Sequence, residues 1–207
     1  MGRYLGSSCK LCRKEKSKLF LKGEKCDVNC ILDKGKRKNL PGQHGISKTK
    51  TSEYGKHLHE KQKAKYIYGV SEKQFRNYFR IASKMKGLTG TNLLMLLERR
   101  LDNVVHKLGF ASSKKFARQL IVHRHILVNN KLKKVPGYLV KPGDKISIKD
   151  RIKDNIFVKK SIENASNIPS WLNLDKTNFI GEVVSLPTRE DISYPIDESL
   201  IVELYSR

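Results

Sequence analysis

Four cysteines are the residues of this chain whose type and spacing point most directly to chemistry, and all lie within the first thirty positions. Two residues separate Cys9 from Cys12, three separate Cys26 from Cys30, and thirteen lie between the pairs. Two chelating pairs at this spacing can supply four thiolates to a tetrahedral structural zinc ion. Four thiolates can also hold an iron–sulfur cluster. We therefore predict bound Zn²⁺, with the cluster as the alternative.

Disulfide and redox roles fit these cysteines less well than metal binding. The chain opens with no signal-peptide pattern, so we expect a cytoplasmic protein, in which stable disulfides are rare. A redox Cys-x2-Cys motif would need a thioredoxin-like βαβ context, which the lysine-rich surroundings do not offer. No apolar stretch approaches the roughly 18 residues of a membrane span, so we expect no membrane partner.

The formal net charge of +23 is unevenly distributed along the 207 residues. Residues 1–90 hold 23 Lys and Arg against 7 Asp and Glu, residues 91–160 hold 17 against 5, and residues 161–207 hold 3 against 8. The first two blocks predict a nucleic acid as partner, because Lys and Arg placed on phosphates release counterions. The acidic block would be repelled by that partner, so we expect it to pack on the body or to face protein.

Two helices and a small sheet are predicted in the centre of the chain. Apolar residues recur at spacings of three and four through residues 93–108, which predicts one leucine-rich helix ended by Gly109. Ser112 or Ser113 can cap a second helix that runs to about Arg124. One face of that helix is apolar. The opposite face is basic and comprises Lys114, Lys115 and Arg118.

Short apolar runs between residues 126 and 148 predict antiparallel strands. They are separated by Asn129-Asn130, by Pro136-Gly137 and by Pro142-Gly143-Asp144, which have turn chemistry. The two helices should therefore lead directly into a small sheet.

The flanking segments are predicted from weaker patterns. Residues 52–65 are expected to be helical, and Ser71 with Gln74 forms a capping box for another helix. Residues 151–167 fit a short helix or linker, and from Trp171 onward, through the end of the chain, the pattern is β-like. The predicted fold class is α+β, with four parts: a zinc clip and basic loop over residues 1–50, a helical domain over 51–92, an RNA-binding module over 93–160, and an acidic, β-like C-terminal segment over 161–207 that packs back on the body.

The stretch RLDNVVHKLGFASSKKFARQLIVHRHILVNN, residues 99–130, resembles the RNA-binding module named after protein four of the small ribosomal subunit. Such modules often place Asn-Gly at the first hairpin turn, where this chain has Asn129-Asn130, and Asn also tolerates positive φ. Further motifs extend the resemblance, in order, over nearly the whole chain: CKLC, LKGEKC, PGQHG, YGVSEKQFRNYF, WLNLD, LPTRED and VELYSR. The sequence is thus similar to the zinc-bearing form of the bacterial small-subunit ribosomal protein four family, although that form commonly has one more residue between its last two cysteines.

This resemblance implies a structural constituent of the small ribosomal subunit and no catalysis. It implies a primary binder of the 5′ domain of small-subunit ribosomal RNA that nucleates assembly of the subunit body and contributes to translational accuracy. Ribosomal protein five and messenger RNA on its way into the subunit are the implied neighbours. The residues assigned to ribosomal RNA are Arg13, Lys14, Lys22, Arg37, Lys38, Gln43, His44, Lys48, Lys50, Arg76, Arg99, Arg100, Asn103, Lys114, Lys115, Arg118, Arg124 and His125.

Two other classes of protein compete with the ribosomal interpretation. An RNA-modifying enzyme is one, because similar modules are appended to pseudouridine synthases and to tyrosyl-tRNA synthetases. The chain contains no GxxxxGK phosphate loop, no HExxH motif and no nucleophile elbow, so we predict that it is not an enzyme. The other is a zinc-clipped RNA chaperone or transcription factor acting off the ribosome, which the residues alone leave open.

Overall fold

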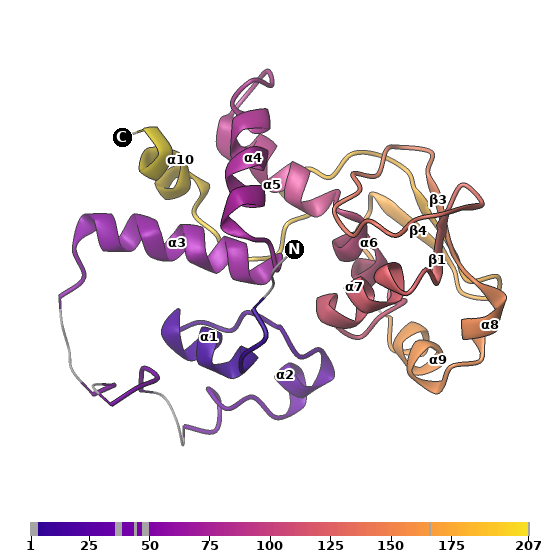
Figure 1. Cartoon of the computed structure of the whole chain (residues 1–207), viewed down its shortest axis with the longest axis horizontal. Helices are drawn as coiled ribbons and strands as arrows, with labels where there is room; N and C mark the ends of the chain where they lie inside the picture. The colour runs from indigo at the N-terminus through magenta and orange to yellow at the C-terminus, as the bar shows by residue number, and fades with distance from the viewer. Residues whose placement is uncertain (1–3, 36–38, 44, 47–49, 166, 207) are drawn as a thin grey trace. The chain divides into compact units, whose positions relative to one another are not determined.

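A computed structural model describes residues 4–35, 39–43, 45–46, 50–165 and 167–206 (Figure 1). The chain forms two compact units. Unit 1 comprises Met1–Gly90 together with Tyr194–Arg207, and unit 2 comprises Thr91–Ser193. Unit 1 is therefore built from both ends of the chain, so its last helix joins it only after the whole of unit 2 has been traversed.

Among its described residues, unit 1 contains helices joined by turns and loops, and no strand. Its helices are α1 (Ser8–Lys14), α2 (Glu24–Val28), α3 (Glu53–Ile67), α4 (Glu72–Ala82) and α10 (Glu198–Ser206). The hydroxyl of Ser52 accepts the Gly55 N–H at 3.2 Å, and that of Ser71 accepts the Gln74 N–H at 3.4 Å. These two N-caps satisfy helix-terminal donors, so the predicted helix over 52–65 and the predicted cap at Ser71 are confirmed.

The end of the chain differs from its prediction. Residues 201–205 were predicted to be β-like from their apolar, β-branched character, but they form the middle of α10, which packs along α3 (Figure 1). Ile201 and Tyr205 are four residues apart and so share one helix face. Ile201 is fully buried, and the Tyr205 ring stacks on Phe79 with 4.4 Å between ring centroids. Burial of this face against α3 and α4 outweighs the weak β-propensity.

Unit 2 has an α+β fold, as predicted. Most of α5 (Thr89–Glu98) lies in it, followed by α6 (Leu101–Lys107), α7 (Lys114–Val122), β1 (Ile126–Val128), β2 (Lys131–Leu132), β3 (Lys145–Ile148), α8 (Asp150–Lys153), α9 (Ile156–Glu163), β4 (Leu172–Asp175) and β5 (Ile180–Val183). The strands form a five-stranded antiparallel sheet in the order β2-β1-β3-β5-β4. The β-like pattern after Trp171 is therefore correct for β4 and β5.

The predicted leucine-rich helix over 93–108 is interrupted at Arg99 and Arg100. Arg100 has extended backbone angles (φ −66°, ψ 135°) and precedes the first turn of α6. The Leu101 N–H donates to the Tyr138 carbonyl at 2.8 Å, and the Val140 N–H donates to the Arg99 carbonyl at 2.9 Å. Backbone groups of residues 136–140 thus replace the helical partners at the break. The apolar period continues across it, so one continuous helix was the wrong prediction.

The first hairpin turn confirms the prediction made for it. Asn129 and Asn130 have φ of +50° and +61°, which Asn adopts more readily than most residues. The turn pairs Val128 with Lys131 and places β2 at the edge of the sheet. Behind the sheet lies one apolar cluster formed by α6, α7 and the strands, in which Phe110 and Trp171 are among the largest buried side chains.

Candidate nucleic-acid interface and cysteine pocket

The segment from residue 103 to residue 149 presents almost exclusively positive charge. It contains eleven Lys and Arg and a single acidic residue, Asp144. Asp144 is buried, and its carboxylate accepts hydrogen bonds from the Asn129 side-chain amide at 2.8 Å and from the Lys141 backbone N–H at 2.9 Å. Because its one carboxylate is used inside the hairpin, the outward charge of this segment is uniformly basic.

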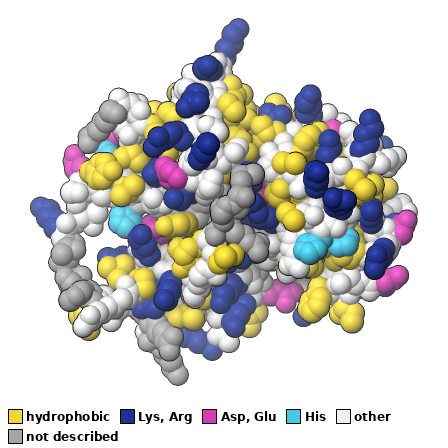
Figure 2. All heavy atoms as spheres, viewed as in Figure 1, with side chains coloured by type: hydrophobic (Ala, Val, Ile, Leu, Met, Phe, Trp, Pro, Cys, Tyr) yellow, Lys and Arg dark blue, Asp and Glu magenta, His cyan; other side chains and the backbone are white. Residues whose placement is uncertain are grey.

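Helix α7 has the apolar face that the sequence predicts, but of the predicted basic face only Lys115 is exposed. The Ser113 hydroxyl accepts the Phe116 N–H at 3.3 Å and starts the helix, while Ala117, Leu120 and Ile121 are buried. Lys115 and, just beyond the helix, Arg124 are exposed, whereas Lys114, Arg118 and His125 are half-buried. Figure 2 shows Lys and Arg side chains spread over the face in view, with two neighbouring histidines among them.

Arg100, which was assigned to RNA, is instead buried against Asp102. The Arg100 Nε and Nη2 atoms donate to the two Asp102 carboxylate oxygens at 3.0 and 2.7 Å, and both residues are less than 5% exposed. Arg118 Nη1 lies 3.5 Å from the same carboxylate. Asp102 therefore joins the start of α6 to α7. In this fold Arg100 is paired with the carboxylate that meets α7 and is almost fully buried.

Asn103 is also buried rather than presented to RNA. Its side-chain amide donates to the Glu98 backbone carbonyl at 3.0 Å and to Glu98 Oε2 at 2.6 Å. The Glu98 carboxylate is fully buried and lies 2.9 Å from Lys107 Nζ. Arg99 is half-buried, its Nε donates to the Val140 carbonyl at 3.0 Å, and burial lowers its pKa. The hydrogen bonds of Asn103, Glu98 and Arg99 therefore stabilise the backbone at the break between α5 and α6.

Several exposed lysines of unit 2 were missing from the predicted set. Lys131 and Lys134 flank or lie in β2, and Lys141 and Lys145 lie in the connection to β3 and at its start. All four are exposed. The charge of the 91–160 block was visible in the sequence, and the loop positions of Lys134 and Lys141 beside the predicted turns could have placed them at the surface.

The predicted residues of unit 1 are mostly exposed, and one is used internally. Arg13 Nε donates to the Asn39 carbonyl at 2.9 Å and Nη2 to the Leu40 carbonyl at 3.3 Å, so Arg13 anchors the following loop. The exposed members are Lys14, Lys22, Gln43, Lys50 and Arg76. Arg37, Lys38, His44 and Lys48 lie outside the described residues.

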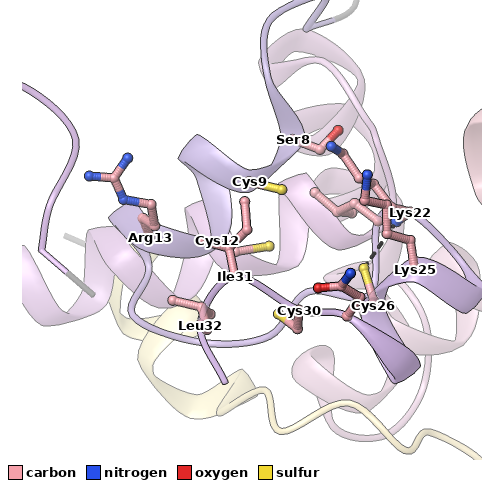
Figure 3. Close-up of a pocket in the computed structure, with 12 residues that line it drawn as sticks. Ser8, Cys9, Cys12, Arg13, Lys22, Lys25, Cys26, Cys30, Ile31 and Leu32 are labelled. Atoms are coloured by element: carbon pink, nitrogen blue, oxygen red, sulfur yellow. Dashed lines mark hydrogen bonds between the residues drawn. The ribbon is translucent and has the colours of Figure 1, made fainter. Parts of the chain in front are cut away.

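All four cysteines line one pocket of about 70 Å³ (Figure 3). Cys9 and Cys12 lie on α1, Cys26 lies on α2 and Cys30 follows α2, so the two predicted pairs face the same space from different elements (Figure 3). Within the described residues, no three His, Cys, Asp or Glu side chains are close enough to hold a metal ion as they stand. The pocket is thus wider than a closed tetrahedral site.

The donor set of this pocket nevertheless suits a soft cation. Burial raises the pKa of Cys12, a backbone hydrogen bond from Leu19 lowers it, and the three other thiols raise it further. Burial likewise raises the pKa of Cys26, whose sulfur accepts the Lys22 N–H at 3.3 Å. The thiols are therefore near enough to repel one another as thiolates, and two receive backbone N–H groups. A cation among them would remove the repulsion.

Among the helices that the structure describes, none is both long and apolar enough to cross a membrane.

Comparison with known proteins assigns both parts of the chain to ribosomal protein families. Residues 3–98 match the family model described as the ribosomal protein S4/S9 N-terminal domain, and residues 99–146 match that of the S4 domain. This chain is similar over its whole length to proteins named small ribosomal subunit protein uS4. It is 57% identical to the one from Endomicrobium trichonymphae, 53% to the one from Thermoanaerobacter sp. (strain X514) and 52% to the one from Geotalea daltonii, each over 100% of both chains. The chain therefore belongs to the small ribosomal subunit protein uS4 family.

Proposed function

We propose that this protein is a structural, non-enzymatic constituent of the small ribosomal subunit that binds ribosomal RNA. The observation that carries the proposal is the 103–149 segment, whose one acidic residue is buried while six of its basic residues are exposed: Lys115, Arg124, Lys131, Lys134, Lys141 and Lys145. Such a surface gains affinity from every phosphate it neutralises. Full-length similarity to proteins named as small-subunit components supports ribosomal RNA of the small subunit as the bound RNA.

The finer assignments follow from the family resemblance. We place the binding site in the 5′ domain of small-subunit RNA, with roles in nucleating the subunit body and in accuracy, in the cytoplasm. Ribosomal protein five and incoming messenger RNA are the proposed neighbours. The acidic 161–207 block supports a protein-facing role only in part, because the Asp191 carboxylate accepts the Thr188 N–H at 2.8 Å and the Ser170 hydroxyl at 2.9 Å. Exposed Glu190 is the better candidate for a partner contact.

The salt dependence of RNA binding tests the proposed interface. Replacing exposed Lys115, Lys131 and Lys134 with Gln should weaken binding to a 5′-domain transcript. Each lost phosphate contact should reduce the slope of log K against log salt by about 0.7–0.9. Lys176→Gln is the control, since Lys176 is exposed in the turn that follows Asp175, away from the basic segment in sequence. An unchanged slope and affinity in the triple variant would remove this face from the interface.

We also propose that the cysteine pocket holds a structural Zn²⁺, with Cys9, Cys12, Cys26 and Cys30 as ligands. The ion would supply a closed, non-catalytic crosslink between α1 and α2. These are short helices, and α2 has no buried side chain of its own. A metal crosslink would therefore provide stability that a core of this size does not, and would fix the orientation of exposed Lys14 and Lys22 toward RNA.

Metal analysis of double variants tests the clip. Purified protein should carry one zinc per chain, and Cys9→Ser/Cys12→Ser should carry none, with faster amide exchange confined to α1, α2 and the intervening residues. Lys10→Ser/Lys14→Ser is the matched control, because both lysines are exposed on α1, and it should keep its metal. Zinc retained in the cysteine variant would reject this ligand set. Iron and labile sulfide in the wild type would assign the cluster instead.

A further inference from the structure

The corner between α7 and β1 carries two histidine rings in a parallel arrangement. The planes of His123 and His125 differ by 4°, and their centroids are 6.3 Å apart. Arg124 between them adopts the left-handed conformation, with φ of +62°. The turn is anchored by backbone bonds from Arg124 N–H to the Ile121 carbonyl at 3.0 Å and from His125 N–H to the Leu120 carbonyl at 2.9 Å. The rings are therefore carried by a rigid corner.

Neither ring covers the other. Aromatic atoms in direct contact lie about 3.5 Å apart, so two five-membered rings with centroids separated by 6.3 Å leave much of each face open. His123 is exposed and His125 is half-buried. Burial lowers the pKa of His125, as do the nearby His123, Lys149 and Arg151. A lowered pKa favours the neutral form of His125, which is suited to stacking rather than to pairing with an anion.

Three basic residues belong to this corner or lie near it. Arg124 is exposed and lies between the two histidines in the sequence, and the Lys149 N–H donates to the His125 carbonyl at 3.0 Å, which fixes the backbone of Lys149 beside the corner. Arg151 is exposed at the start of α8 and close enough to affect His125. Aromatic faces bordered by Lys and Arg are the combination with which proteins hold unpaired nucleotides: bases stack on the rings and phosphates lie on the cations.

We propose that His123 and His125 form a stacking platform for an unpaired nucleobase of the bound RNA. The inference rests on the proposed RNA-binding function and adds that this corner recognises a single-stranded position, where a base is free to leave its own stack. A double-stranded segment would offer the corner only phosphates. Arg124, Lys149 and Arg151 hold the adjoining backbone.

Stacking and charge neutralisation respond differently to salt. The salt dependence of RNA affinity therefore distinguishes a stacking platform from a contact made by cations alone. A lost phosphate contact flattens the dependence of log K on log salt. A lost stacking contact lowers affinity and leaves that slope in place. An aromatic replacement should restore stacking, whereas a polar, non-aromatic replacement of similar size should not.

The test compares His123→Asn/His125→Asn with His123→Phe/His125→Phe in the full chain, using a 5′-domain small-subunit RNA transcript. The Asn variant should bind about 5- to 100-fold more weakly at an unchanged salt slope. It should also leave at least one unpaired nucleotide reactive to base-directed chemical probing that the wild type protects. The Phe variant should keep affinity within about threefold and restore that protection. Gln119→Asn, an exposed change on α7, is the matched control.

Three outcomes would overturn the platform while the RNA-binding function stands. In the first, the Asn variant binds RNA with wild-type affinity. In the second, the Asn variant loses affinity and the slope of log K against log salt flattens as well. In the third, the Phe variant melts like the wild type but does not restore binding. Failure of the wild-type protein to bind the transcript at all would instead reject the proposed function, and the platform with it.

Discussion

Asp102→Ala should be among the most destabilising single changes in unit 2, lowering the free energy of unfolding by about 3–5 kcal/mol. The Asp102 carboxylate receives two hydrogen bonds from buried Arg100, lies 3.5 Å from Arg118, and accepts the Asn103 N–H at 3.0 Å. Alanine would leave the Arg100 guanidinium 3% exposed without this partner. Removal of one partner from a buried ion pair costs more than the pair itself contributes, so the loss should appear as a lower urea midpoint and as faster amide exchange in α6 and α7.

A second variant separates the buried charge from the lost contact. Arg100→Met/Asp102→Leu removes both charges and keeps apolar volume, and it should recover much of the stability lost in Asp102→Ala, because apolar replacement of a buried pair is often neutral. Asp154→Ala is the control: its side chain is 91% exposed beside Lys159, and it should change stability little. If Asp102→Ala melts like that control, the Asp102 carboxylate does not stabilise unit 2.

This buried network explains why part of the predicted RNA-binding set is buried in the structure. Arg100, Asn103 and Lys115 are all polar residues in a basic stretch, and a single sequence does not tell a charge with a buried partner from one at the surface. The partners that bury Arg100 and Asn103 are Asp102 and Glu98, two and five residues away, and their pairing depends on the break between α5 and α6. That break is set by backbone bonds from residues some forty positions later. No local pattern contains that information.

Features governed by local chemistry were predictable. The caps at Ser52, Ser71 and Ser113, the positive φ at Asn129 and Asn130, and the facing of the cysteine pairs all follow from residues close in sequence. The C-terminal helix was missed because its apolar, β-branched residues favour a strand by propensity alone. A signal for the helix was present, since the Asp197 carboxylate accepts the Ser199 N–H at 3.0 Å and so caps the start of α10.

Tyr205 is the side chain through which that helix is attached to unit 1. Its ring stacks on Phe79, lies 6.4 Å from Phe75 and stands 5.9 Å from Lys61 Nζ. Its hydroxyl donates to Glu72 Oε1 at 3.2 Å. Burial raises the pKa of Tyr205 well above its ordinary value, and the nearby Glu72 carboxylate adds to the shift. The tyrosine is therefore a neutral donor throughout the physiological range.

The carboxylate that accepts this bond makes the attachment sensitive to acid. Burial alone would raise the pKa of Glu72, but hydrogen bonds from Lys61 and Lys65 outweigh it and leave the pKa below its ordinary value. A carboxyl whose folded pKa is depressed stabilises the fold above its unfolded pKa, and that contribution is lost as pH falls through the folded value. Attachment of α10 should thus weaken only at pH values below the ordinary range for Glu.

Tyr205→Ala should lower the free energy of unfolding of unit 1 by about 2–4 kcal/mol, somewhat less than removal of a fully buried aromatic ring, because the ring is only half-buried. Tyr205→Phe keeps the stack and loses one hydrogen bond, so it should cost about 1 kcal/mol and abolish the contribution of this bond to acid sensitivity. Tyr54→Ala removes an exposed tyrosine, 56% accessible, from α3 of the same unit and should have little effect. Amide exchange should quicken in α10 and along α3 in the alanine variant alone. Equal protection of α10 in Tyr205→Ala and Tyr54→Ala would mean that Ile201 and its neighbours, rather than the aromatic stack, hold the C-terminal helix in place.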